Sequence, residues 1–260
     1  MNMTEQNTAG KIVPVIAPVE LPFVSPDAVS HSLAVLASVY HYNHWIYTMV
    51  RDFLGESVVE VGSGIGNITR FMLDVKTLVC LEPFEPYREY IASRFSRHLN
   101  VKVVPHRIEE CPNPDVPEGG FRSVVCLNVL EHIEDDIGVL AKCRRLLQPG
   151  GNVIILVPAL PLIYGPIDRA MGHVKRYTKG SLRAAMAKAG FQVISSRYMN
   201  FVGVFGWWWE GRVLGREKIP EKKTRMFNRC VPFLSAVERI VPPLLGQSLV
   251  MVGKAGGGKR

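Results

Sequence analysis

Short apolar runs alternate with amphipathic stretches along most of the chain. Apolar runs near residues 57–61, 77–82, 101–105, 122–128 and 151–157 predict buried strands. The stretches between these runs carry apolar residues at helical spacing, and the clearest is residues 136–147. Regular alternation of strands and helices is typical of a parallel sheet covered by helices on both faces. The pattern therefore predicts an α/β fold with a doubly wound sheet.

The C-terminal part of the chain departs from the simple alternation of strands and helices. A helix over 179–190, closed by Gly190, leads into a strand over 191–198, and the best last strand is 247–253. Residues 199–246 between them are rich in apolar and aromatic side chains, and a connection of that length is usually a binding lid, an interaction element or disordered. We expect a flexible N-terminal arm (1–30), a core (31–198), a helical, hydrophobic cap over the acceptor site (199–246), and a last strand with a flexible tail (247–260).

A glycine-rich loop follows the first predicted strand. Gly62, Gly64 and Gly66 remove Cβ atoms where the backbone must come close to a ligand. Twenty residues after Gly62, the second strand ends in Glu82, placed to accept hydrogen bonds from a ribose diol. Glu60 precedes the loop, where a carboxylate repels phosphate and suits a cationic ligand. The loop therefore predicts a nucleoside ligand with a positive charge.

Four segments resemble a class I S-adenosylmethionine-dependent methyltransferase of the small-molecule type. They are residues 58–66, 81–83, 126–135 and 147–155, which occur in the order of that family and span about residues 40 to 200. The resemblance implies a Rossmann-like sheet of seven strands, mostly parallel with an antiparallel last strand. It also implies S-adenosyl-L-methionine as the methyl donor.

The resemblance and the loop pattern together place a set of residues at the cofactor. Tyr42 belongs to a helix ahead of the first strand, where packing is the alternative role, and Asn128 lies at the carboxyl end of the fourth strand. The family often has an acidic residue before the apolar one that contacts adenine, whereas this chain has Arg107 before Ile108, with Glu109 as a substitute. The expected cofactor-binding residues are Tyr42, Glu60, Gly62, Ser63, Gly64, Gly66, Asn67, Glu82, Pro83, Arg107, Ile108, Asn128 and Val129.

A polar and aromatic loop over residues 164–177 is the best candidate for binding the methyl acceptor. Free histidine titrates near pH 6.5 and can take a proton from a hydroxyl, so His173 is a candidate general base, and His132 is a second one after the fourth strand. In the alternative, His173 and Arg176 only brace the loop, and His132 bonds to backbone at a helix start. The expected acceptor-binding residues are Tyr164, Asp168, Arg176, Tyr177 and Trp207.

The amino-acid composition limits the classes of ligand and partner that the chain is expected to bind. The net charge of +8 favours anionic ligands, but no basic stripe interleaved with aromatics indicates nucleic-acid binding. Five cysteines without Cys-x-x-Cys spacing predict reduced thiols and a cytoplasmic protein. We expect no metal site, since nothing near His41 and His44 completes a ligand set.

The cap allows three interpretations. Its aromatic residues pack in the core or at a homodimer contact, line the acceptor pocket, or, as the least favoured interpretation, meet a membrane surface through Trp207, Trp208 and Trp209 and the basic residues after them. The sequence as a whole predicts O-methylation of a hydroxyl or carboxylate on a small, partly hydrophobic and hydroxylated or anionic metabolite. The alternatives are N- or C-methylation, or a membrane-associated binding protein that keeps the fold.

Overall fold

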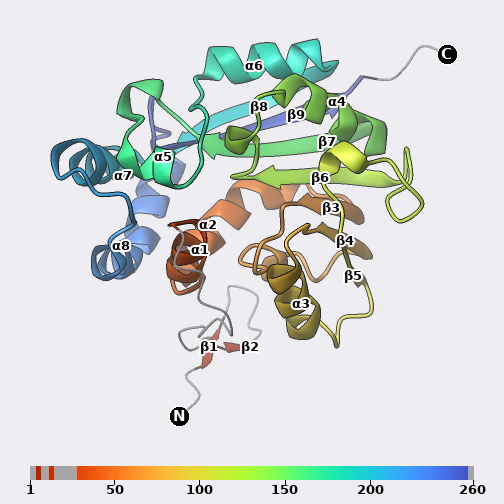
Figure 1. Ribbon diagram of the computed structural model, residues 1–260, viewed down its shortest axis with the longest axis horizontal. Coiled ribbons are helices and arrows are strands. Elements are labelled where there is room, and N and C mark those ends of the chain that lie inside the picture. The colour runs from red at the N-terminus through yellow and green to blue at the C-terminus, as the bar shows by residue number, and fades with distance from the viewer. Residues whose placement is uncertain (1–3, 7–11, 15–27, 257–260) are drawn as a thin grey trace.

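A seven-stranded sheet forms the centre of the molecule (Figure 1). The computed structural model describes residues 4–6, 12–14 and 28–256. The strand order is β5-β4-β3-β6-β7-β9-β8. β9 pairs antiparallel with β7 and with β8, and the other neighbouring strands pair in parallel. The Rossmann-like sheet with an antiparallel last strand is thereby confirmed. The strands are β3 (Ser57–Val61), β4 (Thr77–Leu81), β5 (Val101–Val104), β6 (Phe121–Leu127), β7 (Leu147–Pro158), β8 (Phe191–Met199) and β9 (Ser248–Ala255).

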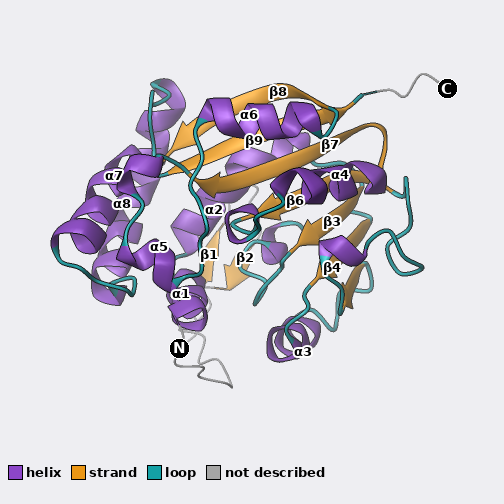
Figure 2. Ribbon diagram, turned by 45° about the horizontal axis from the view of Figure 1, so that its top comes forward, coloured by secondary structure: helices purple, strands orange, loops and turns teal. Residues whose placement is uncertain are grey.

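Helices cover both faces of this sheet, as Figure 2 shows. On one face, α4 (Asp136–Leu146) and α6 (Lys179–Lys188) pack on a cluster that includes Val59, Val124 and Ile155. On the other face, α2 (Tyr40–Val50), α3 (Glu85–Arg94) and α8 (Glu221–Ile240) pack on a cluster that includes Val58, Val125 and Ile154. Successive residues of one strand belong to opposite clusters because strand side chains alternate between faces. The continuous apolar runs of the sequence follow from burial on both faces.

Most predicted boundaries lie within two residues of the observed ones, but β7 differs. The sequence predicts this strand from residue 151, whereas β7 already begins at Leu147. Phe121 pairs with Leu147, and the register then shifts before Ser123 pairs with Asn152. Gly150, with φ 76°, lies in this irregular part. The strand therefore absorbs the glycines in a bulge.

The terminal segments are described only in part. Within the predicted arm, β1 (Thr4–Gln6) pairs antiparallel with β2 (Ile12–Pro14), and α1 (Ala28–Ala37) already begins before residue 30. The rest of the arm and residues 257–260 of the predicted tail lie outside the described residues. The predicted flexibility of both ends therefore stays a prediction.

The segment predicted as a cap is helical. After β8 come α7 (Phe201–Trp208), a π-helical turn (Trp209–Val213) and α8. Together with α5 (Pro166–Ala170), these helices lie beyond the carboxyl ends of β6 and β7 (Figure 1). The backbone N–H of Tyr42 donates to Asn228 Oδ1 at 3.0 Å, which fixes α8 to α2.

In the part of the chain that the structure describes, no helix is long and apolar enough to cross a membrane. The five cysteines are free thiols, and four of them are buried.

Candidate active site

The glycine loop after β3 has the backbone shape that its composition predicts. Gly62, Gly64 and Gly66 have φ angles of 68°, 55° and 78°, which L side chains rarely adopt. A Cβ at Gly62 would lie 2.6 Å from Val129 Cγ2, and one at Gly66 would lie 2.6 Å from Phe95 Cε2. The loop therefore needs glycine both for its dihedral angles and for its packing.

Two carboxylates lie beside this loop. Glu82 accepts backbone hydrogen bonds from Gly64 N at 2.7 Å and from Phe84 N at 2.9 Å. Glu60 is buried and accepts a hydrogen bond from Thr69 Oγ1, and its burial raises its pKa to about 7. A cation at this place would favour the ionised form of Glu60 and offset the cost of burying it. The glycines and Glu60 thus fit a nucleoside ligand with a positive charge.

A cavity of about 510 Å³ lies against the loop. Such a volume is in the range of small-molecule and cofactor sites. One side is formed by Glu60, the glycine loop and Asn128 at the ends of the parallel strands. The opposite side is mostly apolar and comes from α1, α7, α8 and the residues just before α8, with Leu33, Leu36, Val202, Phe205, Ile219 and Phe227 among its residues.

Asp168 organises the polar part of the predicted acceptor loop. Its carboxylate is fully buried and accepts hydrogen bonds from His173 Nδ1 (2.9 Å), Arg176 Nε (2.7 Å), Trp207 Nε1 (3.1 Å) and Gly165 N (3.0 Å). Burial alone would raise the pKa of Asp168, but the bonds from His173 and Arg176 outweigh it and lower that pKa. Asp168 is therefore ionised and holds three side chains that line the cavity.

The bond to Asp168 sets the tautomer of His173. A carboxylate can only accept, so the proton lies on Nδ1 and the lone pair of neutral His173 lies on Nε2. Nε2 lies 4.0 Å from Glu131 Oε1. His173 lines the cavity, and Nε2 is the ring nitrogen that Asp168 leaves without its bond.

Glu131 and His132 complete this corner of the cavity. Burial raises the pKa of Glu131 to about 8, and neither of its carboxylate oxygens has a hydrogen-bond partner among the described residues. His132 Nδ1 bonds to the carbonyl of Gly172 at 3.2 Å, and burial, with the neighbouring His173, lowers the pKa of His132 to about 4. Burial therefore favours the neutral forms of both Glu131 and His132 in this corner.

The same corner also offers metal ligands. Glu131, His132 and His173 each present one ligand atom, and these three atoms lie within 4.8 Å of one another. Two histidines and one carboxylate are a donor set that binds divalent metals. No motif in the sequence links these three residues, because His173 follows His132 by 41 residues and only the fold brings it to Glu131.

The cavity brings together many, though not all, of the residues predicted from the sequence. The predicted residues that line it are Tyr42, Glu60, Gly62, Ser63, Gly64, Asn67, Asn128, His132, His173, Arg176 and Trp207. The predicted residues that do not line it are Gly66, Glu82, Pro83, Arg107, Ile108, Val129, Tyr164, Asp168 and Tyr177. A ribose contact of Glu82 remains a prediction, since both of its oxygens bond to backbone in this conformation.

Several of the predicted residues outside the cavity have packing or bracing roles. The Tyr164 hydroxyl donates to the carbonyl of His173 at 2.7 Å, and the Tyr177 hydroxyl donates to Asp136 Oδ2 at 2.9 Å. Val129 packs against Gly62. These three side chains shape the loops around the cavity without facing it.

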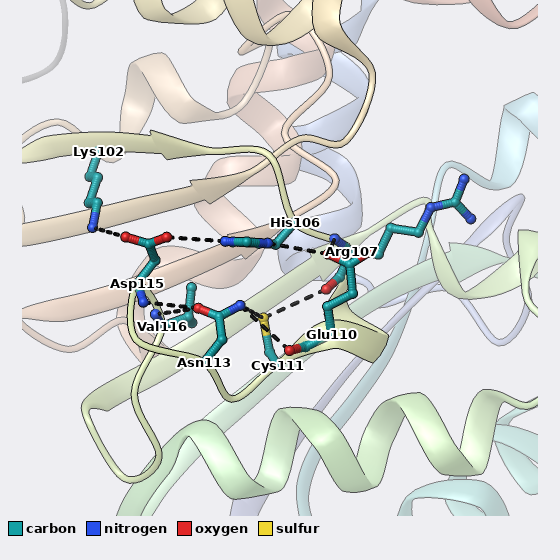
Figure 3. Close-up of polar contacts among 8 residues, drawn as sticks. All are labelled: Lys102, His106, Arg107, Glu110, Cys111, Asn113, Asp115 and Val116. Carbon is teal, nitrogen blue, oxygen red and sulfur yellow. Dashed lines mark hydrogen bonds and ion pairs between the residues drawn. The ribbon is translucent and has the colours of Figure 1, made fainter.

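The predicted adenine segment lies in an exposed polar network after β5 (Figure 3). His106 Nδ1 bonds to Glu110 Oε2 at 3.2 Å, and Arg107 N donates to the same oxygen at 3.3 Å. The Arg107 side chain extends away from this network in Figure 3, and Ile108 is buried in the core. Contact of Arg107, Ile108 or Glu109 with adenine stays a prediction.

Some residues of the cavity were not predicted. Asn200, with φ 63°, and the apolar residues of α1 and α8 line it, although they lie far from every motif in the sequence. Asn200 carried one usable signal, because asparagine tolerates the left-handed conformation and can cap the helix that follows. Asn200 Oδ1 indeed accepts from Gly203 N at 2.9 Å.

Comparisons with known proteins agree with this geometry. Residues 40–196 match a family described as a methyltransferase domain. A ubiquinone biosynthesis O-methyltransferase of Xanthomonas oryzae pv. oryzae is 28% identical over 105 residues, which are 40% of this chain and 44% of that protein. The chain thus spans less than half the length of this curated relative.

Solved structures share the fold at low sequence identity. An S-adenosylmethionine dependent methyltransferase of Mesorhizobium loti has a TM-score of 0.56 and 15% identity, covering 81% of this chain and 97% of that chain. The cyclase SpnF has a TM-score of 0.57 and 13% identity, covering 84% of this chain and 82% of that chain. This likeness concerns the fold, which hosts more than one chemistry.

Proposed function

Because the chain belongs to the methyltransferase domain family, as its match over residues 40–196 shows, we propose that it catalyses O-methylation of a small, partly hydrophobic metabolite. The family and its structural neighbours imply S-adenosylmethionine as the methyl donor. The observation that carries O-methylation is the Asp168 and His173 pair, which presents a basic nitrogen to a largely apolar cavity.

The residues of the glycine loop fit the donor. Gly62 and Gly64 let the backbone approach a nucleoside, and Glu60 offers a buried carboxylate to a positive charge. S-adenosylmethionine, when bound, supplies a methyl group on a positively charged sulfur. The apolar side of the cavity excludes water from the reacting atoms, and the protein aligns them there.

His173 has the role of general base in this proposal. Its Nε2 takes the proton of the acceptor hydroxyl as the oxygen forms its bond to the methyl carbon and the carbon–sulfur bond breaks. Asp168 keeps the Nδ1 proton in place and stabilises the imidazolium that forms. The proton thus ends on His173, and the sulfur leaves as a neutral thioether.

The charges around the cavity favour a hydroxyl over a carboxylate acceptor. Arg176 is already paired with Asp168 at 2.7 Å, and Lys223 is paired with Glu210. A carboxylate acceptor needs a cation or several donors to replace its water, whereas a neutral hydroxyl needs mainly a base. We therefore rank a phenol-like or enol-like hydroxyl first as the acceptor group and a carboxylate second.

In this proposal, the helices of residues 199–246 form the acceptor side of the site.

Methyl transfer from labelled S-adenosylmethionine to a host metabolite extract tests the proposal. We expect one or a few labelled products by mass spectrometry, with the label on oxygen. His173→Ala should lower turnover about 10²-fold to 10⁴-fold, the usual contribution of a general base, and added imidazole should restore part of it. Label on nitrogen or carbon, or full activity of His173→Ala, would contradict the O-methylation mechanism.

A metal-assisted form of the same reaction is the second candidate. It is favoured by Glu131, His132 and His173, whose three ligand atoms lie together beside the cavity. With His173 as a base, removal of divalent ions by EDTA leaves turnover unchanged. Loss of turnover in EDTA and its recovery with Mn²⁺ would instead assign activation of the hydroxyl to a bound metal.

A further inference from the structure

Exposed apolar side chains gather on α7, α8 and the residues that follow each of them. This region, residues 201–245, is one end of the molecule, where α7 and α8 lie side by side in Figures 1 and 2. We call it the α7–α8 surface. Its exposed large apolar residues are Phe201, Val202, Phe205, Trp208, Trp209, Val213, Leu214, Met226, Phe233, Val237, Ile240, Val241, Leu244 and Leu245. Soluble surfaces rarely collect so many, and such a patch marks an interaction site.

On α8 the exposed residues form two adjacent stripes. Met226, Phe233, Val237 and Ile240 follow one another at helical spacing on one side of the helix. Arg225 and Arg229 lie beside that stripe, and both are exposed. The inward side of α8 is held by Val231, which is 1% exposed in the core. The apolar stripe therefore faces away from the protein.

The start of α7 is fixed to the end of α8, so the two exposed faces form one surface. Glu238 of α8 accepts hydrogen bonds from Asn200 N at 3.0 Å and Phe201 N at 2.8 Å. The Phe201 and Phe205 rings pack edge to face at 5.3 Å and are both exposed. Trp208 and Trp209 extend this face at the other end of α7.

Charge distinguishes between the partners that could cover this surface. Residues 201–246 contain eight lysines and arginines against four glutamates, a net charge of +4, which is half of the net charge of the whole chain. A second copy of the chain would bring like charges together, which is unfavourable. An anionic lipid surface complements both the basic residues and the apolar stripe.

We propose that the α7–α8 surface docks on an anionic phospholipid bilayer. Tryptophans favour the headgroup level, and Lys or Arg residues beside them attract anionic lipid. Phe233 and Ile240, which are 71% and 81% exposed, enter the acyl boundary. The contact is peripheral, since no helix in the described ranges is long and apolar enough to span a membrane.

The position of the cavity relates this docking to the proposed reaction. Val202 and Phe205 line the cavity and are also 43% and 59% exposed, so the cavity opens on the α7–α8 surface. If the proposed methyl transfer holds, its acceptor is a hydroxylated compound dissolved in the bilayer, which enters the cavity directly from the lipid. This last step rests on the proposed function, whereas docking itself does not.

Vesicle co-sedimentation of the full chain, without cofactor or acceptor, tests the docking. We expect binding to phosphatidylcholine vesicles that contain phosphatidylglycerol, weak binding to phosphatidylcholine alone, and release by salt. The double variant Phe233→Ser with Ile240→Ser should bind at least about ten-fold more weakly, since two apolar side chains no longer leave water. Arg229→Glu should bind about thirty-fold more weakly, at about five-fold for each unit of charge.

Two matched control variants show whether a loss of vesicle binding is specific to the α7–α8 surface. Leu99→Ser removes a fully exposed leucine, and Arg183→Glu reverses an exposed charge on α6, each remote from this surface. Both controls should bind like the unchanged chain. Failure to bind anionic vesicles, or equal binding by all variants, would overturn the docking. So would a dimer in sedimentation equilibrium that Phe233→Ser dissociates.

The readouts of docking and of catalysis are independent. The docking variants change residues that do not line the cavity, so they should retain methyl transfer to an acceptor dissolved in detergent. Methyl transfer without vesicle binding would contradict only the docking proposal. Vesicle binding without methyl transfer to any metabolite extract would contradict only the proposed function.

Discussion

At the scale of single residues, two buried carboxylates beside the cavity have opposite surroundings. Asp168 accepts four hydrogen bonds and has a lowered pKa, whereas Glu131 accepts none from the described residues and has a pKa raised by burial to about 8. Sequence spacing could place Asp168, His173 and Arg176 in one loop. It could not show that the loop folds over Glu131, because that contact depends on the strand order.

The raised pKa of Glu131 predicts a pH-dependent loss of stability. The unfolded chain releases this proton near pH 4.5 and the folded chain near pH 8, so the folded state binds more protons between these values. Stability therefore falls as pH rises through this window. Glu131→Gln, which does not titrate, should be more stable than the unchanged chain at pH 8 by on the order of 4 kcal/mol and nearly equal to it at pH 5.

Chemical denaturation at both pH values measures this difference. Glu134→Gln, in the same turn but exposed, is the matched control and should track the unchanged chain. If the free energy of unfolding changed with pH equally in the unchanged chain and in Glu131→Gln, Glu131 would not be buried as a neutral acid.

At the scale of elements, the local sequence pattern predicted the bounds of those strands whose ends are set by their own residues and the loop that follows. β3 and β4 begin at the predicted residues because a continuous apolar run and the loop that follows it define each strand. β7 begins earlier than predicted because pairing of Leu147 with Phe121 outweighs the turn preference of Pro149 and the glycines. α7 and α8 could be foreseen as helical, but not which of their faces would stay exposed.

The loop after β3 gives the element-scale prediction. Gly62→Ala and Gly119→Ala both force alanine into positive φ, at a cost of about 1–2 kcal/mol each. At Gly62 the new Cβ also meets Val129 at 2.6 Å, whereas nothing lies within 4 Å at Gly119. Gly62→Ala should therefore weaken S-adenosylmethionine binding at least about ten-fold, and Gly119→Ala should leave it unchanged.

Calorimetry on the two purified variants makes this comparison, with a thermal melt to confirm that both are folded. Equal affinities for the two variants would mean that the Gly62 backbone does not approach the cofactor.

At the scale of the whole molecule, the cavity is assembled from segments that span most of the chain. α1 and α2 close one side, residues at the ends of β3 and β6 line the centre, and α7 and α8 form the side proposed for the acceptor. Residues such as Leu33 and Phe227 carry no motif, because their role depends only on where the fold places them. The sequence could predict that the glycine loop and Glu60 line this cavity, but not the composition of its apolar side.

Calorimetric titration of S-adenosylmethionine into the full chain tests the central claim most directly. The account predicts saturable binding at one site, with no comparable binding of NAD, because the carboxylate of Glu60 at the glycine loop disfavours a pyrophosphate. Absence of binding by S-adenosylmethionine, or tighter binding of NAD, would contradict it.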